Sequence, residues 1–178
     1  MYQIGDVIVY GGEGVCRVDA IGVLDIPSIN KDRLYYTLSP FYRDGKIFTP
    51  VDTTVFMRPV ITSEEVQHLI KQLPEMRTNA LYEYRNLKML SDHYEASLQT
   101  HDYTDLLQLI KSVYTKQQVL AENGKKLCKT DERYLKLAEE ALYREFAVAL
   151  GMLKEDVKSY IEETVKKLAS GQTSSNQK

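Results

Sequence analysis

Hydrophobic and polar residues alternate along the first sixty positions of the chain, and a period of two is typical of short β-strands. Gly11, Gly12 and Gly14 supply the positive φ angles of a tight turn, and Asp44-Gly45 marks a second hairpin. Several short strands so close together indicate a small barrel of the SH3 or Tudor type. The expected strands cover 6–10, 15–24, 33–40, 46–50 and 54–58.

Beyond Val60 the hydrophobic residues recur every three or four positions, which predicts amphipathic helices. Thr62 and Glu65 have the spacing of a capping box. Asp102 is a suitable cap for a later helix, which Asn123-Gly124 would end. The expected helices cover 62–73, 79–98, 102–123, 130–150 and 154–169.

These patterns predict an α+β fold, with an N-terminal small SH3/Tudor-like β barrel followed by a C-terminal all-α helical bundle. The barrel would occupy 1–61 and the bundle 62–170. The tail over 171–178 is rich in Ser, Gln and Asn, and we expect it to be disordered. With 178 residues, 43% of them hydrophobic, the chain can bury a core in one large or two small domains.

The composition narrows the classes of function. No apolar run is long enough to cross a bilayer, and no secretory signal opens the chain, so we expect a cytoplasmic protein with no membrane partner. Because the formal net charge is −2, any contact with DNA depends on local clusters of cations. Cys16 and Cys128 lie far apart without a nearby His, so we expect neither a zinc site nor a disulfide.

No residue pattern in the sequence predicts catalysis. His68, His93 and His101 are scattered, and no metalloprotease or serine-hydrolase motif is present. The glycine-rich turn lies between expected strands and lacks the Lys-Ser/Thr pair of a phosphate-binding loop. We therefore expect no enzyme, no cofactor, no metal and no small-molecule substrate.

Three segments resemble, in this order, parts of one known family. They are Ile-Gly-Asp-Val-Ile-Val-Tyr at 4–10 with Gly-Val-Cys-Arg-Val-Asp-Ala-Ile at 14–21, the strand at 46–52, and the helix start at 127–135. They are similar to the opening, the closing strand and a helix start of the CarD family of bacterial transcription regulators. This family shares its polymerase-interacting module with the transcription-repair coupling factor. The resemblance implies that the barrel binds the β subunit of RNA polymerase, and that the helices contact promoter DNA just upstream of the melting region and stabilise the open complex.

The resemblance also implies which residues contact polymerase. The family uses the edge around the second and fourth strands, where main-chain hydrogen bonds can extend a partner's sheet. The corresponding positions here are Leu24 and Phe48, and Arg33 and Lys46 lie close enough in sequence to supply positive charge. Tyr36 is the remaining candidate. For Tyr36 and Phe48, a place in the barrel core is the alternative interpretation.

For the DNA contact, the family places a tryptophan wedge at the minor groove, but this chain has no Trp. The wedge position falls on Ala80, and Leu81 or Tyr82 could replace it, although each is also a plausible packing residue. Glu132 stands at a site that the family often fills with a basic residue, and it would repel a phosphate.

Cations near the starts of two bundle helices would meet phosphates if those helix starts are neighbours in space. The alternative is that each of them only solvates the bundle surface. We expect the resulting DNA binding to be weak and not sequence-specific. The candidate cations are Arg77, Arg85, Lys88, Lys125, Lys126, Lys129 and Arg133.

Two functions therefore remain open. The first is a CarD-like regulator that joins polymerase to promoter DNA, in which a weak DNA contact gains from tethering. The second is a protein-binding adaptor that contacts polymerase without useful DNA binding. A barrel-helix module unrelated to polymerase is a third and less favoured possibility.

Overall fold

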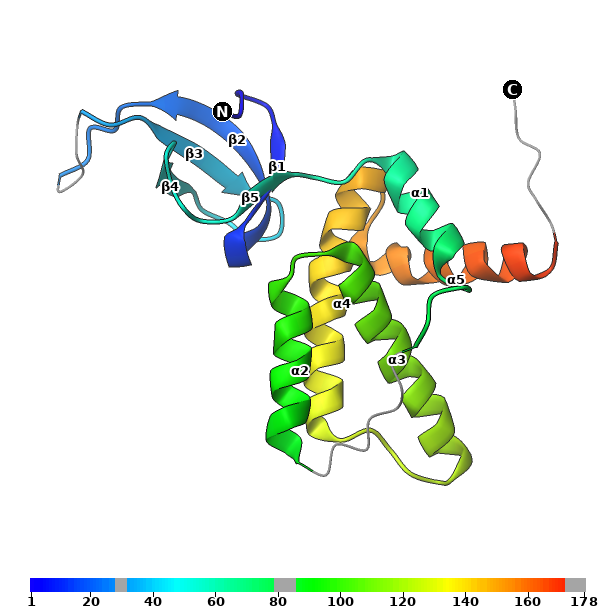
Figure 1. Ribbon diagram of the computed structural model, residues 1–178. Helices are drawn as coiled ribbons and strands as arrows, with labels where there is room; N and C mark the ends of the chain where they lie inside the picture. The colour runs from blue at the N-terminus through cyan, green and yellow to red at the C-terminus, as the bar shows by residue number, and fades with distance from the viewer. Residues whose placement is uncertain (28–31, 79–85, 172–178) are drawn as a thin grey trace.

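The computed structural model of the chain describes residues 1–27, 32–78 and 86–171. It has an antiparallel sheet followed by helices, so the α+β class and the order of its two parts are confirmed (Figure 1). The strands are β1 (Val7–Tyr10), β2 (Gly14–Gly22), β3 (Tyr35–Pro40), β4 (Ile47–Pro50) and β5 (Met57–Pro59).

The sheet is open among the described residues. Its hydrogen-bonded order is β4-β3-β2-β1-β5, which leaves β4 and β5 at the two edges. The predicted barrel closure is therefore not observed. Strand β5 has only three residues and ends on Pro59, whose nitrogen has no hydrogen to donate to a further strand.

The turn between β1 and β2 depends on Gly11. This residue has a φ of 43°, and a Cβ atom added to it would lie 2.9 Å from Cγ1 of Val55. Glycine meets both demands, because it tolerates a positive φ and has no side chain to clash. The turn completes the predicted β1–β2 hairpin through a single 3₁₀ turn over Gly11–Glu13.

Most of the predicted helices are confirmed within a residue or two of their predicted ends. The capping box of Thr62 and Glu65 is present, and the Asp102 side chain accepts hydrogen bonds from the backbone N–H groups of Thr104 and Asp105. The helices are α1 (Ser63–Gln72), α2 (Leu87–Gln99), α3 (Tyr103–Glu122), α4 (Lys129–Leu150) and α5 (Lys154–Ala169).

Two helix starts differ from the prediction. Asn86 is extended (φ −125°, ψ 114°) and its side chain accepts a hydrogen bond from Lys88 N–H, so α2 begins at Leu87 and the predicted continuous helix over 79–98 is wrong; the predicted start at 79 lies outside the described residues. Helix α4 begins one residue before Thr130, because Cys128 is its N-cap and forms a capping box with Asp131.

Two hydrophobic clusters form the interior. The sheet buries Ile8, Cys16, Val18, Tyr36 and Leu38, while a larger cluster lies among the helices and includes Ile61. The change from one cluster to the other falls after β5, close to the predicted boundary at 61. No helix of the described residues combines the length and the apolar character that crossing a membrane requires.

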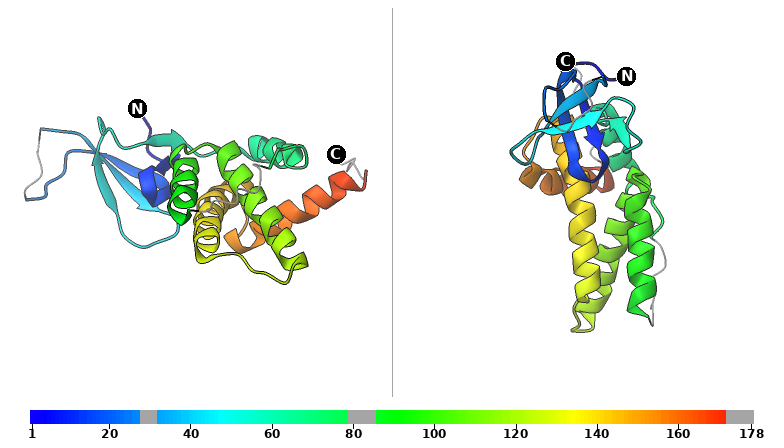
Figure 2. Two further views of the ribbon diagram at one scale, coloured as in Figure 1. Left: turned by 60° about the horizontal axis from the view of Figure 1, so that its bottom comes forward. Right: turned by 90° about the vertical axis from the view of Figure 1, so that its left-hand side faces the viewer.

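The helices α2 and α4 run in the same direction, with α3 antiparallel to them (Figure 1). The sheet lies beside the C-terminal part of α4, and the N-termini of α2 and α4 lie together at the far end of the bundle, as the right-hand view of Figure 2 also shows. The molecule therefore presents a sheet edge at one end and two helix starts at the other.

Candidate protein-binding edge and basic helix end

Strand β4 offers an unpaired edge, because among the described residues it pairs only with β3. Phe48 lies on this strand with 43% of its surface exposed. Its neighbour Thr49 is buried and accepts a hydrogen bond of 3.0 Å from the Tyr10 hydroxyl. The alternation fixes β4 on the sheet and leaves Phe48 accessible, which suits the addition of a strand from a partner.

Charged residues flank β4 at both ends. Lys46 precedes the strand, and its Nζ lies 3.8 Å from Oδ2 of Asp19. Beyond the strand, Arg33 makes two contacts with Asp52, Nε to Oδ1 at 2.9 Å and Nη2 to Oδ2 at 2.7 Å. The hydrogen bond from Arg33 holds the pKa of the Asp52 carboxyl below its usual value. Lys46 and Arg33 therefore lie at opposite ends of the Phe48 strand.

The other two predicted polymerase-binding residues are placed differently. Tyr36 is 1% exposed, and its hydroxyl accepts a hydrogen bond of 2.9 Å from Tyr2 N–H, so its side chain lies in the core. Tyr36 therefore has the alternative place that the sequence allowed, in the core, whereas Phe48 does not. Leu24 is half-buried beyond the end of β2, and β3 separates that strand from β4.

The far end of the bundle gathers five of the predicted DNA-binding cations. The starts of α2 and α4 are neighbours there, since Ser91 Oγ lies 2.7 Å from the Tyr134 hydroxyl and the Tyr94 hydroxyl donates to Asp131. The condition that the sequence set for a shared basic face is thus met. We call this set the basic end: Lys88, Lys125, Lys126, Lys129 and Arg133, all exposed.

Aromatic rings organise part of the basic end. The Arg133 guanidinium lies 5.4 Å from the centre of the Tyr134 ring, which in turn lies 5.4 Å from the centre of the Tyr94 ring. The adjacent Glu132 is exposed and adds a negative charge. The basic end is therefore a mixed surface with an excess of cations.

The remaining predicted DNA-binding residues are not brought to this end by the described contacts. Arg77 is exposed and follows Met76, whose carbonyl accepts a hydrogen bond of 2.6 Å from Lys111 at the middle of α3. Four candidates lie outside the described residues, namely Ala80, Leu81, Tyr82 and Arg85.

Two apolar residues of the basic end were missed from the sequence. Leu87 and Met89 are 62% and 59% exposed on the first turn of α2, on either side of Lys88. The predicted helix covers 79–98, so Leu87 and Met89 fall in its interior. Recognising Asn86 as an N-cap would have moved the start to its observed place.

A buried carboxylate lies beneath the basic end. Asp131 is completely buried and accepts hydrogen bonds from Lys116 Nζ (2.8 Å to Oδ2), the Tyr94 hydroxyl (2.8 Å to Oδ1) and Cys128 Sγ (3.2 Å to Oδ2). Burial alone would raise the pKa of this carboxyl, but the hydrogen bonds from Lys116, Tyr94 and Cys128 outweigh burial and lower the pKa. Asp131 is thus an anion that ties three helices together.

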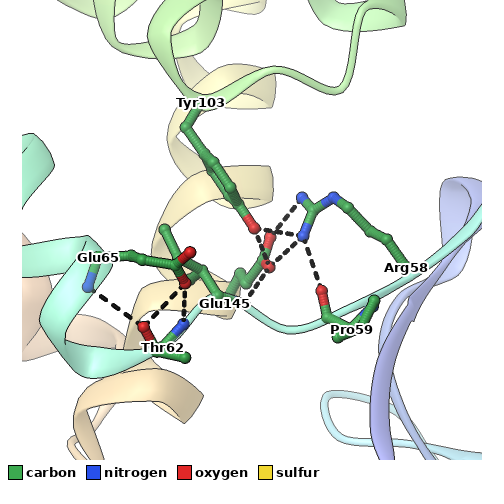
Figure 3. A network of polar contacts seen from close by, with 7 residues as sticks. Arg58, Pro59, Thr62, Glu65, Tyr103 and Glu145 are labelled. Carbon is green, nitrogen blue, oxygen red and sulfur yellow. Dashed lines mark hydrogen bonds and ion pairs between the residues drawn. The ribbon is translucent and has the colours of Figure 1, made fainter.

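A second buried carboxylate joins the sheet to the bundle (Figure 3). Glu145 on α4 receives Arg58 from β5 in a two-pronged contact, Nη1 to Oε1 at 2.5 Å and Nη2 to Oε2 at 2.8 Å. The Tyr103 hydroxyl donates to the same Oε1 at 2.6 Å and accepts a hydrogen bond from Arg58. The Ile61 N–H also donates to Oε1, at 3.0 Å. Four parts of the chain therefore meet at one carboxylate: strand β5, the segment between β5 and α1, helix α3 and helix α4.

The electrostatics of this junction favour a fixed ion pair. Burial alone would lower the pKa of the Arg58 guanidinium, but the hydrogen bonds and negative charge of Glu145 hold it above the usual value. Burial, and then the hydrogen bond to Glu145, raise the pKa of Tyr103, so its hydroxyl keeps its proton. The Arg58 guanidinium also lies 4.5 Å from the centre of the Tyr103 ring.

The described residues contain no group of three or more His, Cys, Asp or Glu side chains that could hold a metal ion. Both cysteines are free. His101 connects α2 to α3 and its ring stacks on Phe56, with ring centres 4.3 Å apart. The contacts of this histidine are thus those of a packing residue.

Comparison with protein families identifies the sheet. Residues 2–61 match the family model described as the CarD-like/TRCF RID domain. No curated protein shows a significant match to the chain. The matched residues include all five strands and end at Ile61, where the helical cluster begins. This type of domain indicates RNA polymerase as a partner and a role connected with transcription. Residues 2–61 are therefore a CarD-like domain of the kind shared with the transcription-repair coupling factor.

Proposed function

We propose that the protein is a bacterial transcription regulator that binds the β subunit of RNA polymerase through its sheet, contacts promoter DNA through its helices and stabilises the open complex. The family match of residues 2–61 is the observation that carries this proposal. Polymerase works in the bacterial cytoplasm, so we place the protein there, as a non-enzymatic binding protein. We also propose domain boundaries at 1–61, 62–170 and 171–178.

The β4 edge supports the polymerase contact. An unpaired strand can extend a sheet of the β subunit through main-chain hydrogen bonds, while side chains select the partner. Phe48 is exposed on that strand, and Arg33 and Lys46 stand at its two ends. We assign the main contact to Phe48, with the two cations adding charge complementarity.

The basic end supports the DNA contact. Five exposed cations lie around the starts of α2 and α4, where each can meet a phosphate. Such contacts are individually weak, salt-sensitive and indifferent to sequence. Binding to polymerase would hold the basic end close to duplex DNA, so that a high effective concentration offsets the weak intrinsic affinity.

One observation favours the second candidate function, an adaptor that binds polymerase without useful DNA contact. Glu132 is exposed beside Arg133 and would repel a phosphate, and the formal net charge of the chain is −2. Promoter footprinting with polymerase separates the two functions. The regulator extends protection upstream of the melting region when the full-length protein is added, whereas the adaptor leaves the footprint unchanged.

Charge reversal tests the residues of the basic end. We expect Lys129→Glu combined with Arg133→Glu to abolish the upstream protection while polymerase is still bound. A double variant with the same change in net charge, Lys71→Glu and Lys167→Glu, lies on exposed positions of α1 and α5 and serves as the control. Protection that persists in the first variant would assign the DNA contact to another surface.

A further inference from the structure

Several side chains cross the junction between the sheet and the bundle. Besides the Glu145 site, the sheet residues Tyr42 and Phe56 reach the helices. The Tyr42 hydroxyl donates to the Arg144 carbonyl at 2.8 Å, and Phe56 stacks on His101. Tyr42 and Phe56 are both exposed, at 38% and 39%. The side chains of Arg58 and Glu145 are 22% and 5% exposed, so their ion pair is more buried than the Tyr42 and Phe56 side chains.

The geometry of the Glu145 site restricts rotation. A guanidinium that binds both oxygens of a carboxylate fixes the plane of the pair as well as its distance. The Tyr103 ring lies against the guanidinium, and its hydroxyl bridges Arg58 and Glu145 (Figure 3). The Ile61 N–H, from the connection after β5, binds the same carboxylate oxygen. The site is thus held from three directions.

We propose that Arg58, Glu145 and Tyr103 are positioning residues that fix the angle between the sheet and the helical bundle, so that the β4 edge and the basic end can engage polymerase and DNA together. The fixed angle is a property of the free protein. Its benefit for joint binding rests on the proposed function.

The length of α4 makes this angle matter. Glu145 follows Asp131 by fourteen positions, which corresponds to about 21 Å along the helix at 1.5 Å per residue. A tilt of about 10° at the junction would move the basic end by about 4 Å over that length. Such a shift is large compared with the range of a phosphate hydrogen bond.

The half-buried Tyr103 hydroxyl supports the same role. It is protonated at neutral pH like any tyrosine, and its raised pKa extends this state into the alkaline range, so it can donate to Glu145 while accepting from Arg58. Relative motion is the default for two domains unless their interface is large and hydrophobic, and a desolvated pair with fixed geometry opposes that motion.

The test measures a distance between two spin labels in the free, full-length protein. The labels are attached at Ala20→Cys on β2 and Ala96→Cys on α2, both exposed positions, in a Cys128→Ser background that keeps a capping oxygen. Cys16 should remain unlabelled because it is fully buried, and burial raises the pKa of its thiol to about 11.

We expect one narrow distance distribution for the labelled parent protein. Arg58→Met should broaden it by roughly twofold, and Tyr103→Phe should broaden it less, because the ring remains and only the bridging hydroxyl is lost. Arg43→Met is the matched control. Arg43 also forms a close ion pair, with Glu13 at 2.6 Å, but that pair is exposed and lies within the sheet region. The distance distribution of Arg43→Met should equal that of the labelled parent protein.

An unchanged narrow distribution in folded Arg58→Met, as judged by circular dichroism, would overturn the proposal. If Arg58→Met does not fold, Tyr103→Phe decides the matter, and an unbroadened distribution in that variant is then the contradicting result. A broad distribution in the parent protein would also contradict a fixed angle.

The second readout is joint binding. Arg58→Met should bind duplex DNA alone and polymerase alone as the parent does, and should bind a polymerase–promoter complex on the order of tenfold more weakly. Equal affinity of both proteins for that complex would contradict the benefit of a fixed angle. Absence of polymerase binding by the parent would instead contradict the proposed function, since the distance measurement needs no polymerase.

Discussion

Helix α4 carries a buried carboxylate near each end, and the two differ in which parts of the molecule supply their hydrogen-bond donors. Both Asp131 and Glu145 accept hydrogen bonds from a cationic side chain and a tyrosine hydroxyl. The partners of Asp131 come from α2, α3 and the cap of α4 itself. Glu145 instead receives its cation from β5 and a backbone N–H from the connection that follows.

The same chemistry therefore serves two levels of organisation. Asp131 fixes helices against one another and shapes the basic end, while Glu145 fixes the whole bundle against the sheet. Loss of the cation at either end leaves an anion buried, which is costly in both cases. Only at the Glu145 end does the loss also release the relative orientation of the two candidate binding surfaces.

The largest effect should come from Lys116→Met, which leaves Asp131 completely buried without its cation. We expect the free energy of unfolding to fall by about 4 kcal/mol, because an uncompensated buried charge must be neutralised or hydrated. Chemical denaturation monitored by circular dichroism measures this loss. Lys125→Met, at an exposed position of the same end, should change stability by less than about 0.5 kcal/mol. If Lys116→Met also lost less than about 0.5 kcal/mol, the ion pair of Lys116 with Asp131 would not hold the helices together.

Arg58→Met should cost somewhat less, about 3 kcal/mol, because Glu145 keeps a small exposed fraction of 4% whereas Asp131 has none. Here the denaturation curve should also become less cooperative, since the sheet and the bundle lose their main polar connection. In Lys116→Met, the sheet and the bundle should still unfold together in one cooperative transition. Identical curve shapes for both variants would remove the distinction between the two carboxylates.

The two ends of α4 should also respond to opposite extremes of pH. The pKa of Asp131 is lowered in the folded protein, so its contribution to stability is present above its ordinary value of 3.8 and is lost as the pH falls through the folded pKa. The pKa of Tyr103 is raised, so its contribution is present below its ordinary value of 10.0 and is lost as the pH rises above it.

Melting temperatures measured from acid to alkali test this pairing. Tyr103→Phe should reduce the loss of stability at alkaline pH by roughly 1 kcal/mol of unfolding free energy, which appears as a smaller fall in melting temperature. The loss of stability at acid pH should be the same as in the parent protein. Lys116→Met should change the acid branch and not the alkaline one. An alkaline branch unaffected by Tyr103→Phe would assign that loss to other half-buried tyrosines, such as Tyr143, whose pKa is also raised by desolvation.

The smallest effect should come from the cap of α4. Cys128→Ala removes the side chain that accepts from Asp131 N–H and donates to its carboxylate, which should cost about 1 kcal/mol. Cys128→Ser preserves both roles and should stay within about 0.5 kcal/mol of the parent. Thermal unfolding compares the two variants, and equal losses would show that the thiol has no capping role.

The sequence predicted what short-range rules decide. The capping box at Thr62 and the bounds of α5 were found because each depends on residues a few positions apart. The start of α2 was missed because the hydrophobic spacing continues across Asn86, whose side chain accepts a hydrogen bond from Lys88 N–H and so caps a helix that begins at Leu87. The Cys128 cap was missed because cysteine is not among the usual capping residues.

The site was less predictable, since its contacts join distant residues. Arg58 and Glu145 are 87 positions apart, and nothing in either local pattern indicates their pairing. Phe48 and Tyr36 occupy similar alternating strands, yet one is exposed on the edge strand and the other is buried in β3. The face of the sheet decides between them: Tyr36 pairs with buried Thr49, whereas Phe48 pairs with Thr37 on the opposite face, and this register follows from packing of the whole sheet.

The most direct test of the account is a pull-down of core RNA polymerase by the full-length protein and by Phe48→Asp. We expect the parent to retain polymerase and Phe48→Asp to bind at least about tenfold more weakly, because a charge replaces an exposed aromatic anchor at the β4 edge. Val119→Asp, at a position of α3 with similar exposure (41% against 43%), should bind as the parent does. Failure of the parent protein to retain polymerase would contradict the central claim.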